Sequence, residues 1–202
     1  MKYWKFPESL LLCLLIGLAD VPLHATASPT TTNETWSLQS LMNGLSQRRS
    51  GEARFTETKY LSSLKKPLMV EGLLHYNYPD SLEKENLKPN LERYVIEGDS
   101  LEIYNDAKLV HKVSLSDYPS VEGFMKALIA TMSGDLDALG KHFQVALRGT
   151  RENWDLKLQP LDDVLKKSIR QIEVSGQASN VTRFEVQQQN GDRSVMQITP
   201  LT

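Results

Sequence analysis

Histidine is the residue type in this 202-residue chain that is best suited to metal binding or acid-base catalysis. The chain has four histidines, and no two of them stand at the spacing of a metal motif such as HExxH. They are His24, His75, His111 and His142. We therefore expect solvated or capping roles for them, and we expect neither a metal site nor a cofactor.

The other local signatures of enzymes are also missing from the sequence. There is no GxSxG serine motif and no glycine-rich phosphate loop. The pair Asp162-Asp163 stands beside Lys166-Lys167, a pattern typical of a solvated helix or turn. A hydrolase assembled from distant residues stays open, but the sequence predicts a protein that is not an enzyme.

The first 27 residues are typical of a secretory signal peptide. Lys2 and Lys5 precede an apolar run at residues 10–19, and the small-x-small triplet Ala25-Thr26-Ala27 follows. The apolar run is shorter than the roughly 20 residues that span a bilayer. We therefore expect cleavage near Ala27 and a mature protein that works outside the cytoplasm.

The rest of the chain predicts one cysteine-free domain. Cys13 is the single cysteine, and Leu12 stands before it where a lipoprotein anchor needs a small residue. Residues 28–35 are rich in Ser, Thr, Pro and Asn and predict a flexible leader. Residues 36–202 have the length of a single domain. The net charge of −2, with both signs interspersed, argues against a nucleic-acid partner.

Two segments have the apolar spacing of amphipathic helices. The first covers residues 36–49, just before Gly51, and the second begins at Ser116-Asp117 with Pro119 in its first turn and ends at Ser133-Gly134. A weaker helical segment follows at residues 135–139. The apolar positions are Leu38, Leu41, Met42 and Leu45 in the first helix, and Val121, Phe124, Met125, Leu128, Ile129 and Met132 in the second.

Alternating apolar and polar residues predict strands through most of the remaining chain. Val70, Gly72, Leu74, Tyr76 and Tyr78 share one face of an extended segment that ends at Pro79-Asp80. Further strands are predicted at residues 93–96, 101–104, 143–147, 154–158, 172–174, 181–186 and 195–198, with turns at 97–99, 105–106 and 190–192. Strands in succession predict a mainly β member of the α+β class, with helices on one face of a curved antiparallel sheet.

Several segments of this chain resemble the LolA family of periplasmic carriers of outer-membrane lipoproteins. They are the helix that ends near Gly51, the triplet Phe55-Thr56-Glu57, and residues 71–80 (EGLLHYNYPD), 96–101 (IEGDSL) and 154–160 (WDLKLQP). The resemblance covers nearly all of the chain after the signal peptide. It is closer to a divergent LolA-related branch than to the main lipoprotein chaperone.

The resemblance implies an incomplete antiparallel β-barrel with helices that cover its concave face. Such a fold holds acyl chains of a lipid or lipoprotein in an apolar cavity. It implies a monomeric periplasmic carrier that moves cargo toward the outer membrane between membrane-bound donor and acceptor proteins. Neither an enzymatic activity nor a cofactor is implied.

The same resemblance assigns candidate lipid-binding residues. In the main family an arginine before a proline helps to hold the helical lid closed, and here Tyr78 stands before Pro79. Tyr78 keeps one hydrogen-bond donor but lacks the charge of a guanidinium. Leu82 falls near an aromatic cavity position of the family. The expected lid residues are Leu45, Phe124 and Leu128, and the expected sheet residues are Phe55, Leu74, Tyr76, Tyr78, Leu82, Tyr94, Ile96 and Trp154.

Three alternatives stay open at this point. The periodicity of the apolar residues fits a dry, filled core as well as a pocket. The same scaffold suits a module that senses lipid or binds a protein segment to report on the state of the cell envelope. An enzyme acting on a lipid-linked substrate would need polar groups converging in the pocket, and strand parity places Tyr78 and His75 on opposite faces.

Overall fold

The computed structural model describes residues 36–201, apart from the side chains of residues 119–121, 123, 124 and 127. Within this range the chain forms one eleven-stranded sheet in the order β6-β5-β4-β3-β2-β1-β11-β10-β9-β8-β7, with every neighbouring pair antiparallel. The predicted signal peptide and leader lie outside the described residues. The strands are β1 (Ser50–Tyr60), β2 (Leu68–Asn77), β3 (Ser81–Lys88), β4 (Glu92–Glu97), β5 (Ser100–Asn105), β6 (Lys108–Ser114), β7 (Phe143–Gly149), β8 (Trp154–Pro160), β9 (Ile169–Gln177), β10 (Asn180–Gln188) and β11 (Arg193–Pro200).

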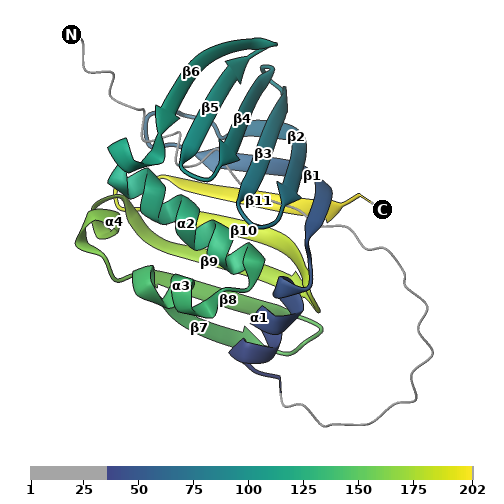
Figure 1. Ribbon diagram of the computed structural model, residues 1–202. Helices are drawn as coiled ribbons and strands as arrows, with labels where there is room; N and C mark the ends of the chain where they lie inside the picture. Colours follow the sequence, from purple (N-terminus) through teal and green to yellow (C-terminus); the bar gives the residue numbers. More distant parts are fainter. Residues whose placement is uncertain (1–35, 202) are drawn as a thin grey trace.

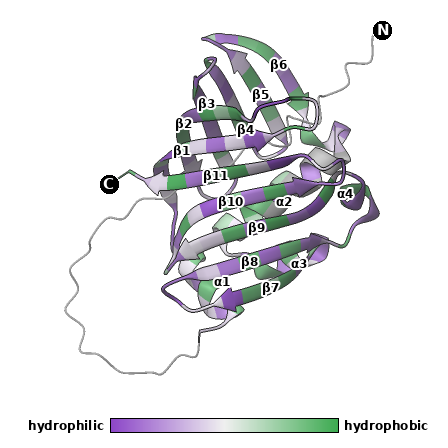
Figure 2. Cartoon of the chain, turned by 180° about the vertical axis from the view of Figure 1, so that it is seen from behind, coloured by the Kyte–Doolittle hydropathy of each residue, from purple (hydrophilic) through white to green (hydrophobic). Residues whose placement is uncertain are grey.

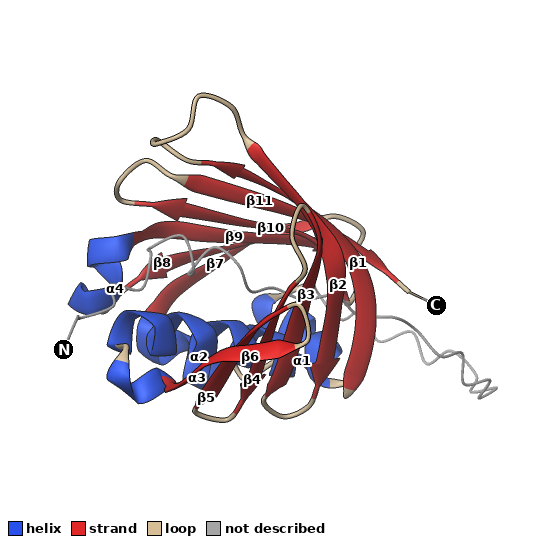
Figure 3. Ribbon diagram, turned by 90° about the horizontal axis from the view of Figure 1, so that it is seen from above, coloured by secondary structure: helices blue, strands red, loops and turns tan. Residues whose placement is uncertain are grey.

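The sheet is strongly curved, and short helices lie against its concave face (Figure 1). The view from above shows α1, α2 and α3 inside the curve of the strands (Figure 3). Seen from behind, hydrophilic and hydrophobic residues follow one another along many of the strands (Figure 2). The predicted mainly β architecture is therefore confirmed. The helical segments are α1 (Leu38–Ser46), the 3-10 turn η2 (Leu115–Asp117), α2 (Pro119–Ser133), α3 (Leu136–His142) and α4 (Asp163–Ser168).

Capping residues fix the ends of the two helices that the sequence predicted. Ser37 and Ser40 form a capping box at the start of α1, which is therefore shorter than the predicted 36–49. Pro119 occupies the first turn of α2, and Gly134 ends it in the left-handed conformation with φ of 68°. A Cβ on Gly134 would lie 2.2 Å from the carbonyl oxygen of Met42, so this glycine lets α1 and α2 meet.

The helices bury their apolar faces against the sheet in one continuous core. Leu41, Met42 and Leu45 of α1 are buried together with Met125 and Leu128 of α2. None of the helices in the described part of the chain is both long enough and apolar enough to cross a bilayer. The amphipathic pattern of α1 and α2 thus corresponds to a layer that covers the concave face of the sheet.

Three strands have no counterpart among the sequence predictions, namely β1, β3 and β6. The inward-facing positions of β1 include Glu57 and Lys59, and those of β3 include Lys84 and Asn86. Charged residues at buried positions break the apolar alternation by which strands are recognised. Strand β6 is an edge of the sheet and is exposed along most of its length, so its sequence lacks the apolar alternation of a strand with one buried face.

The end of β2 also differs from the prediction. The strand stops at Asn77, and Tyr78 stands in the turn with 43% of its surface exposed instead of continuing the buried face of Tyr76. Pro79 follows Tyr78 and cannot donate a ladder hydrogen bond, which accounts for the early end. The predicted turns at Gly98 and Asp106 are found, and both residues have positive φ.

An ion pair is buried inside the curved sheet. Lys84 of β3 places its Nζ atom 2.6 Å from Oε2 of Glu57 on β1, and both side chains are buried almost completely. Ser194 of β11 donates a hydrogen bond to Oε1 of the same carboxylate, and Lys59 lies 3.8 Å from it. The Lys84 ammonium also lies 4.7 Å from the centre of the Phe55 ring. The concave face therefore combines apolar side chains with this charged cluster.

Gly72 of β2 is expected to tolerate no side chain. A Cβ there would lie 1.9 Å from the carbonyl oxygen of Glu85 and 2.7 Å from the Phe55 ring. We expect Gly72→Ala to lower the free energy of unfolding by about 1–3 kcal/mol, measured by urea denaturation. The control is Gly140→Ala in α3, where no atom lies within 4 Å and the helix should gain about 0.5–1 kcal/mol. Equal stability of the two variants would contradict this packing.

The buried ion pair generates a second stability prediction. We expect Lys84→Met to lower the free energy of unfolding by about 3 kcal/mol, because the buried Glu57 carboxylate loses its nearest cation. Lys88→Met on the same strand is the matched control. Its partner Glu71 is half-exposed, so the expected loss is below about 1 kcal/mol. A loss for Lys84→Met no larger than that of the control would show that the pair has little effect on stability.

Candidate functional site

Nine of the eleven predicted lipid-binding residues lie in one buried apolar cluster between the sheet and the helices. Across the sheet, Tyr76 on β2 pairs with Leu82 on β3, which pairs with Ile96 on β4, so their side chains form a row on the concave face. The helices supply the opposite side of this interior. The nine residues are Leu45, Phe55, Leu74, Tyr76, Leu82, Tyr94, Ile96, Leu128 and Trp154.

Two predicted site residues have other positions. Phe124 belongs to α2, but its side chain lies outside the described residues. Tyr78 is in the turn after β2, at the rim of the interior and not in it. The other nine predicted residues come from both expected layers, with Leu45 and Leu128 on the helical side and the rest on the sheet. Their role in binding lipid stays a prediction.

Trp154 on β8 is held in place by β9 and the turn that follows it. Its ring lies over Gly176 of β9, where a Cβ would be 2.3 Å from the ring, and its Nε1 donates to the carbonyl oxygen of Ala178 at 2.8 Å. Ser179 lies next to Ala178 in the chain and contacts Gly44 of α1. Trp154 thus fixes the end of the interior where α1 meets the turn between β9 and β10.

Tyr76 carries a polar group into the apolar interior. Its hydroxyl oxygen is buried and has no hydrogen-bond partner among the described residues. Burial, followed by the neighbouring Tyr78, raises the pKa of Tyr76 to about 12. The phenol therefore stays neutral at any physiological pH and keeps a hydrogen bond to donate.

A cleft of about 610 Å³ opens where the helices meet the rim of the sheet. It lies between the β2–β3 turn, the β4–β5 turn and the helices α2 and α3, and we call it the rim cleft. Its wall combines apolar side chains with charges of both signs. The lining residues are Tyr78, Pro79, Asp80, Gly98, Lys126, Ile129, Ala130, Ser133, Asp135, Ala138, Lys141 and His142.

An arginine from another segment contacts Tyr78 at the rim of this cleft. The guanidinium carbon of Arg49 lies 4.1 Å from the centre of the Tyr78 ring. The backbone N–H of Tyr78 also donates to the carbonyl oxygen of Arg49 at 2.7 Å. Arg49 follows α1 in the chain, so a cation–π contact links the helical side to the β2–β3 turn. The sequence prediction did not include Arg49, because residue type alone does not reveal this partner.

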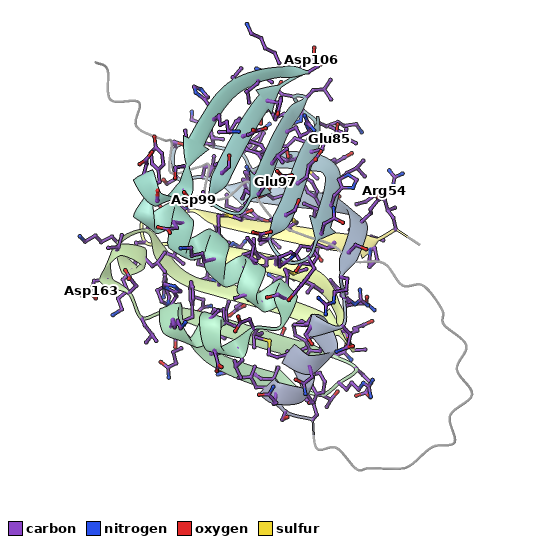
Figure 4. All side chains as sticks on the ribbon, viewed as in Figure 1. Arg54, Glu85, Glu97, Asp99, Asp106 and Asp163 are labelled. Carbon is purple, nitrogen blue, oxygen red and sulfur yellow. The ribbon has the colours of Figure 1, made fainter. Side chains whose placement is uncertain are left out.

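Asp99 links the other wall of the rim cleft to α2. Its carboxylate accepts hydrogen bonds from Ser114 Oγ and from the backbone N–H of Ser116, the latter at 3.1 Å. Figure 4 shows Asp99 in the β4–β5 turn beside the start of α2. The start of α2 is thereby tied to the sheet by polar contacts, whereas the described part of its body packs through apolar side chains.

The sequence prediction also missed the charged cluster of Glu57, Lys59 and Lys84. The alternation of side chains along a strand could have identified them. Glu57 stands two residues after Phe55, and Lys84 stands two residues after Leu82, so each shares a face with an apolar residue. That inference requires β1 and β3 to be recognised as strands first. The interior predicted to be apolar therefore has a charged region beside Phe55.

Three solved structures are similar to this chain at low sequence identity. A LolA superfamily protein from Nitrosomonas europaea is 10% identical, with 82% of this chain and 92% of that chain covered and a TM-score of 0.43. A DUF1329 family protein from Desulfovibrio piger is 12% identical, with 80% and 88% covered and a TM-score of 0.48. The Pseudomonas aeruginosa MucA/MucB complex gives 13% identity, 80% and 55% coverage and a TM-score of 0.41.

Among curated proteins, none matches the sequence. The model of one protein family does match, over residues 26–200, which is nearly the whole chain. The description of that family is outer membrane lipoprotein carrier protein LolA-like. The resemblance seen in the sequence motifs is thereby confirmed, and the chain belongs to the LolA-like family.

Proposed function

We propose that this protein is a periplasmic carrier that shelters the acyl chains of a lipid or lipoprotein on the way to the outer membrane. The observation that carries the proposal is the apolar interior lined from two separate layers, with the rim cleft at their junction. Acyl chains would enter where the helices part from the sheet. Membership of the LolA-like family supports the same function.

The energetics of acyl burial fit such an interior. Each methylene group removed from water contributes about 0.8 kcal/mol, so part of one acyl chain is enough for useful affinity. Four buried methionines, Met42, Met125, Met132 and Met196, lie in the core between α1, α2 and β11. Methionine side chains are flexible and polarisable, which suits an interior that repacks around cargo of variable shape.

The polar groups of the interior give the carrier a way to orient its cargo. In the proposed complex, the Tyr76 hydroxyl donates a hydrogen bond to an ester or amide carbonyl near the head of an acyl chain. The Glu57–Lys84 pair lies beside Phe55, where it would limit how deep an apolar chain can go. No catalytic group is needed for this function.

The first test is native mass spectrometry, with lipid extraction, of protein purified from the periplasm without detergent. We expect a stoichiometric acylated ligand in the wild-type protein. We expect Leu128→Glu to abolish it, because the new carboxylate would enter the apolar interior. Leu109→Glu on the exposed edge strand β6 is the control and should keep its lipid.

Other outcomes of this experiment discriminate between the functions. An empty wild-type protein that takes up no fatty acid or lipopeptide contradicts the carrier and favours a filled core. Unchanged lipid in a folded Leu128→Glu variant contradicts this pocket. A protein partner that stays bound after the lipid is stripped would favour a sensing or interaction module of the cell envelope.

The contact between Arg49 and Tyr78 is expected to slow the opening of the rim cleft. A cation–π contact at a partly exposed site contributes about 0.5–1 kcal/mol. Arg49→Ala should therefore raise the rate of uptake of a fluorescent fatty acid about two- to fivefold. The control is Arg93→Ala, since Arg93 stacks on Tyr104 at 4.2 Å and neither residue lines the rim cleft. Equal uptake rates in the two variants would show that Arg49 does not control opening.

A further inference from the structure

The turn between β1 and β2 exposes apolar side chains at its tip and beside it. Leu64 in the turn is 49% exposed, Tyr60 at the end of β1 is 41% exposed, and Met69 at the start of β2 is 58% exposed. We call residues 60–69 the 60–69 hairpin. We propose that this hairpin docks the protein on the surface of a bilayer that contains anionic lipids.

The charges of the hairpin complement such a surface. Lys65 and Lys66 follow Leu64 directly, and both are exposed. No acidic residue occurs between Glu57 and Glu71, although the whole chain has a net charge of −2. Lysines beside an anionic bilayer are attracted to it, and apolar side chains next to them enter the interface.

Neighbouring residues on β11 extend this cationic surface. Arg193 pairs with Tyr60 across β1 and β11, and its guanidinium carbon lies 4.3 Å from the centre of the Tyr60 ring. Two carboxylates belong to the same surface. Glu185 lies 3.8 Å from Arg193 and also pairs with Arg183. Asp192 accepts hydrogen bonds from the Ser62 backbone N–H at 2.7 Å and from Asn190 Nδ2 at 3.0 Å. Lys65, Lys66, Arg183 and Arg193 together outnumber Asp192 and Glu185, so the charge around the hairpin tip stays positive.

Contacts within the protein already fix the conformation of the hairpin tip. Leu61 is partly buried against the core, and its carbonyl oxygen accepts a hydrogen bond from the Leu64 backbone N–H at 2.9 Å. Asp192 holds Ser62 from the neighbouring β10–β11 turn. Little conformational entropy is therefore lost when Leu64 inserts, and a tyrosine at the level of the headgroups adds to the contact.

The exposed Leu91 lacks this combination of apolar and cationic side chains. Leu91, at the β3–β4 turn, is 50% exposed, but its neighbours include Glu92 and Asp106. The backbone N–H of Asp106 donates to the carbonyl oxygen of Leu91, so these acidic side chains belong to the same corner, where Figure 4 labels Asp106. An anionic bilayer would repel that corner. Exposed apolar area alone therefore does not define the docking surface.

The position of the hairpin leaves the rim cleft accessible. The hairpin lies at the start of β2, and Tyr78 follows the end of β2. The ten residues of this strand therefore separate the two by about 33 Å. Docking and cargo exchange would thus use opposite ends of this strand. The inference does not depend on the carrier function, because it rests on the exposed surface of the hairpin.

Vesicle sedimentation tests this docking directly. We expect the full mature protein to bind vesicles of phosphatidylethanolamine and phosphatidylglycerol, with less binding at high salt, and not to bind vesicles of phosphatidylcholine alone. Lys65→Ala with Lys66→Ala should lower the partition coefficient about 25-fold, since each lysine contributes about fivefold. Leu64→Ser should lower it about tenfold.

Two control variants make the test specific. Leu91→Ser removes a leucine of equal exposure, and Lys108→Ala with Lys112→Ala removes two exposed lysines on β6. Both should bind vesicles like the wild type. Absence of wild-type binding, or an equal loss in the control variants, would overturn the proposal. Lipid content by native mass spectrometry should be unchanged in the hairpin variants, so failure of docking and failure of the carrier function give different results.

Discussion

The pairing of β1 with β11 is the constraint on which the rest of the structure depends. Residues 53–60 pair with residues 193–200, which lie 133 to 147 positions later in the chain, while β1 also pairs with β2 on its other side. This pairing joins two antiparallel meanders, β1–β6 and β7–β11, into one sheet whose edges are β6 and β7. Because the chain between β6 and β7 has to pass from one edge to the other, it crosses the concave face as α2 and α3 (Figure 1).

This crossing explains why the interior has two layers. The sheet supplies rows of side chains such as Tyr76, Leu82 and Ile96, and the helices close over them. The described contacts between the two layers are mostly apolar packing, which has no preferred direction. Directional contacts lie at the rim, where Asp99 accepts hydrogen bonds and Arg49 stacks on Tyr78. Separation of these helices from the sheet would break no strand-to-strand hydrogen bond. The charged cluster around Glu57 stays with the strands, because its partners come from β1, β3 and β11.

Much of the local structure follows from the sequence. The periodicity and the caps of α1 and α2 predict both helices, with errors of a few residues where Ser37 and Pro119 set the ends. Alternation predicts β2, β4, β5 and most strands of the second half. It fails for β1 and β3, where Glu57 and Lys84 occupy buried positions, and for the exposed edge β6. The tertiary partners that make these charges tolerable cannot be read from either strand alone.

The sequence by itself determined the family, the mainly β class and the apolar residues available for an interior, because these depend on motifs and on periods of two and 3.6 residues. The tertiary structure decided which of these residues share that interior, and it placed Tyr78 at the rim against Arg49. It also placed Arg193 against Tyr60 beside the exposed Leu64. Such juxtapositions arise from strand register and from the crossing of the concave face, which bring together residues far apart in the chain and leave no local pattern.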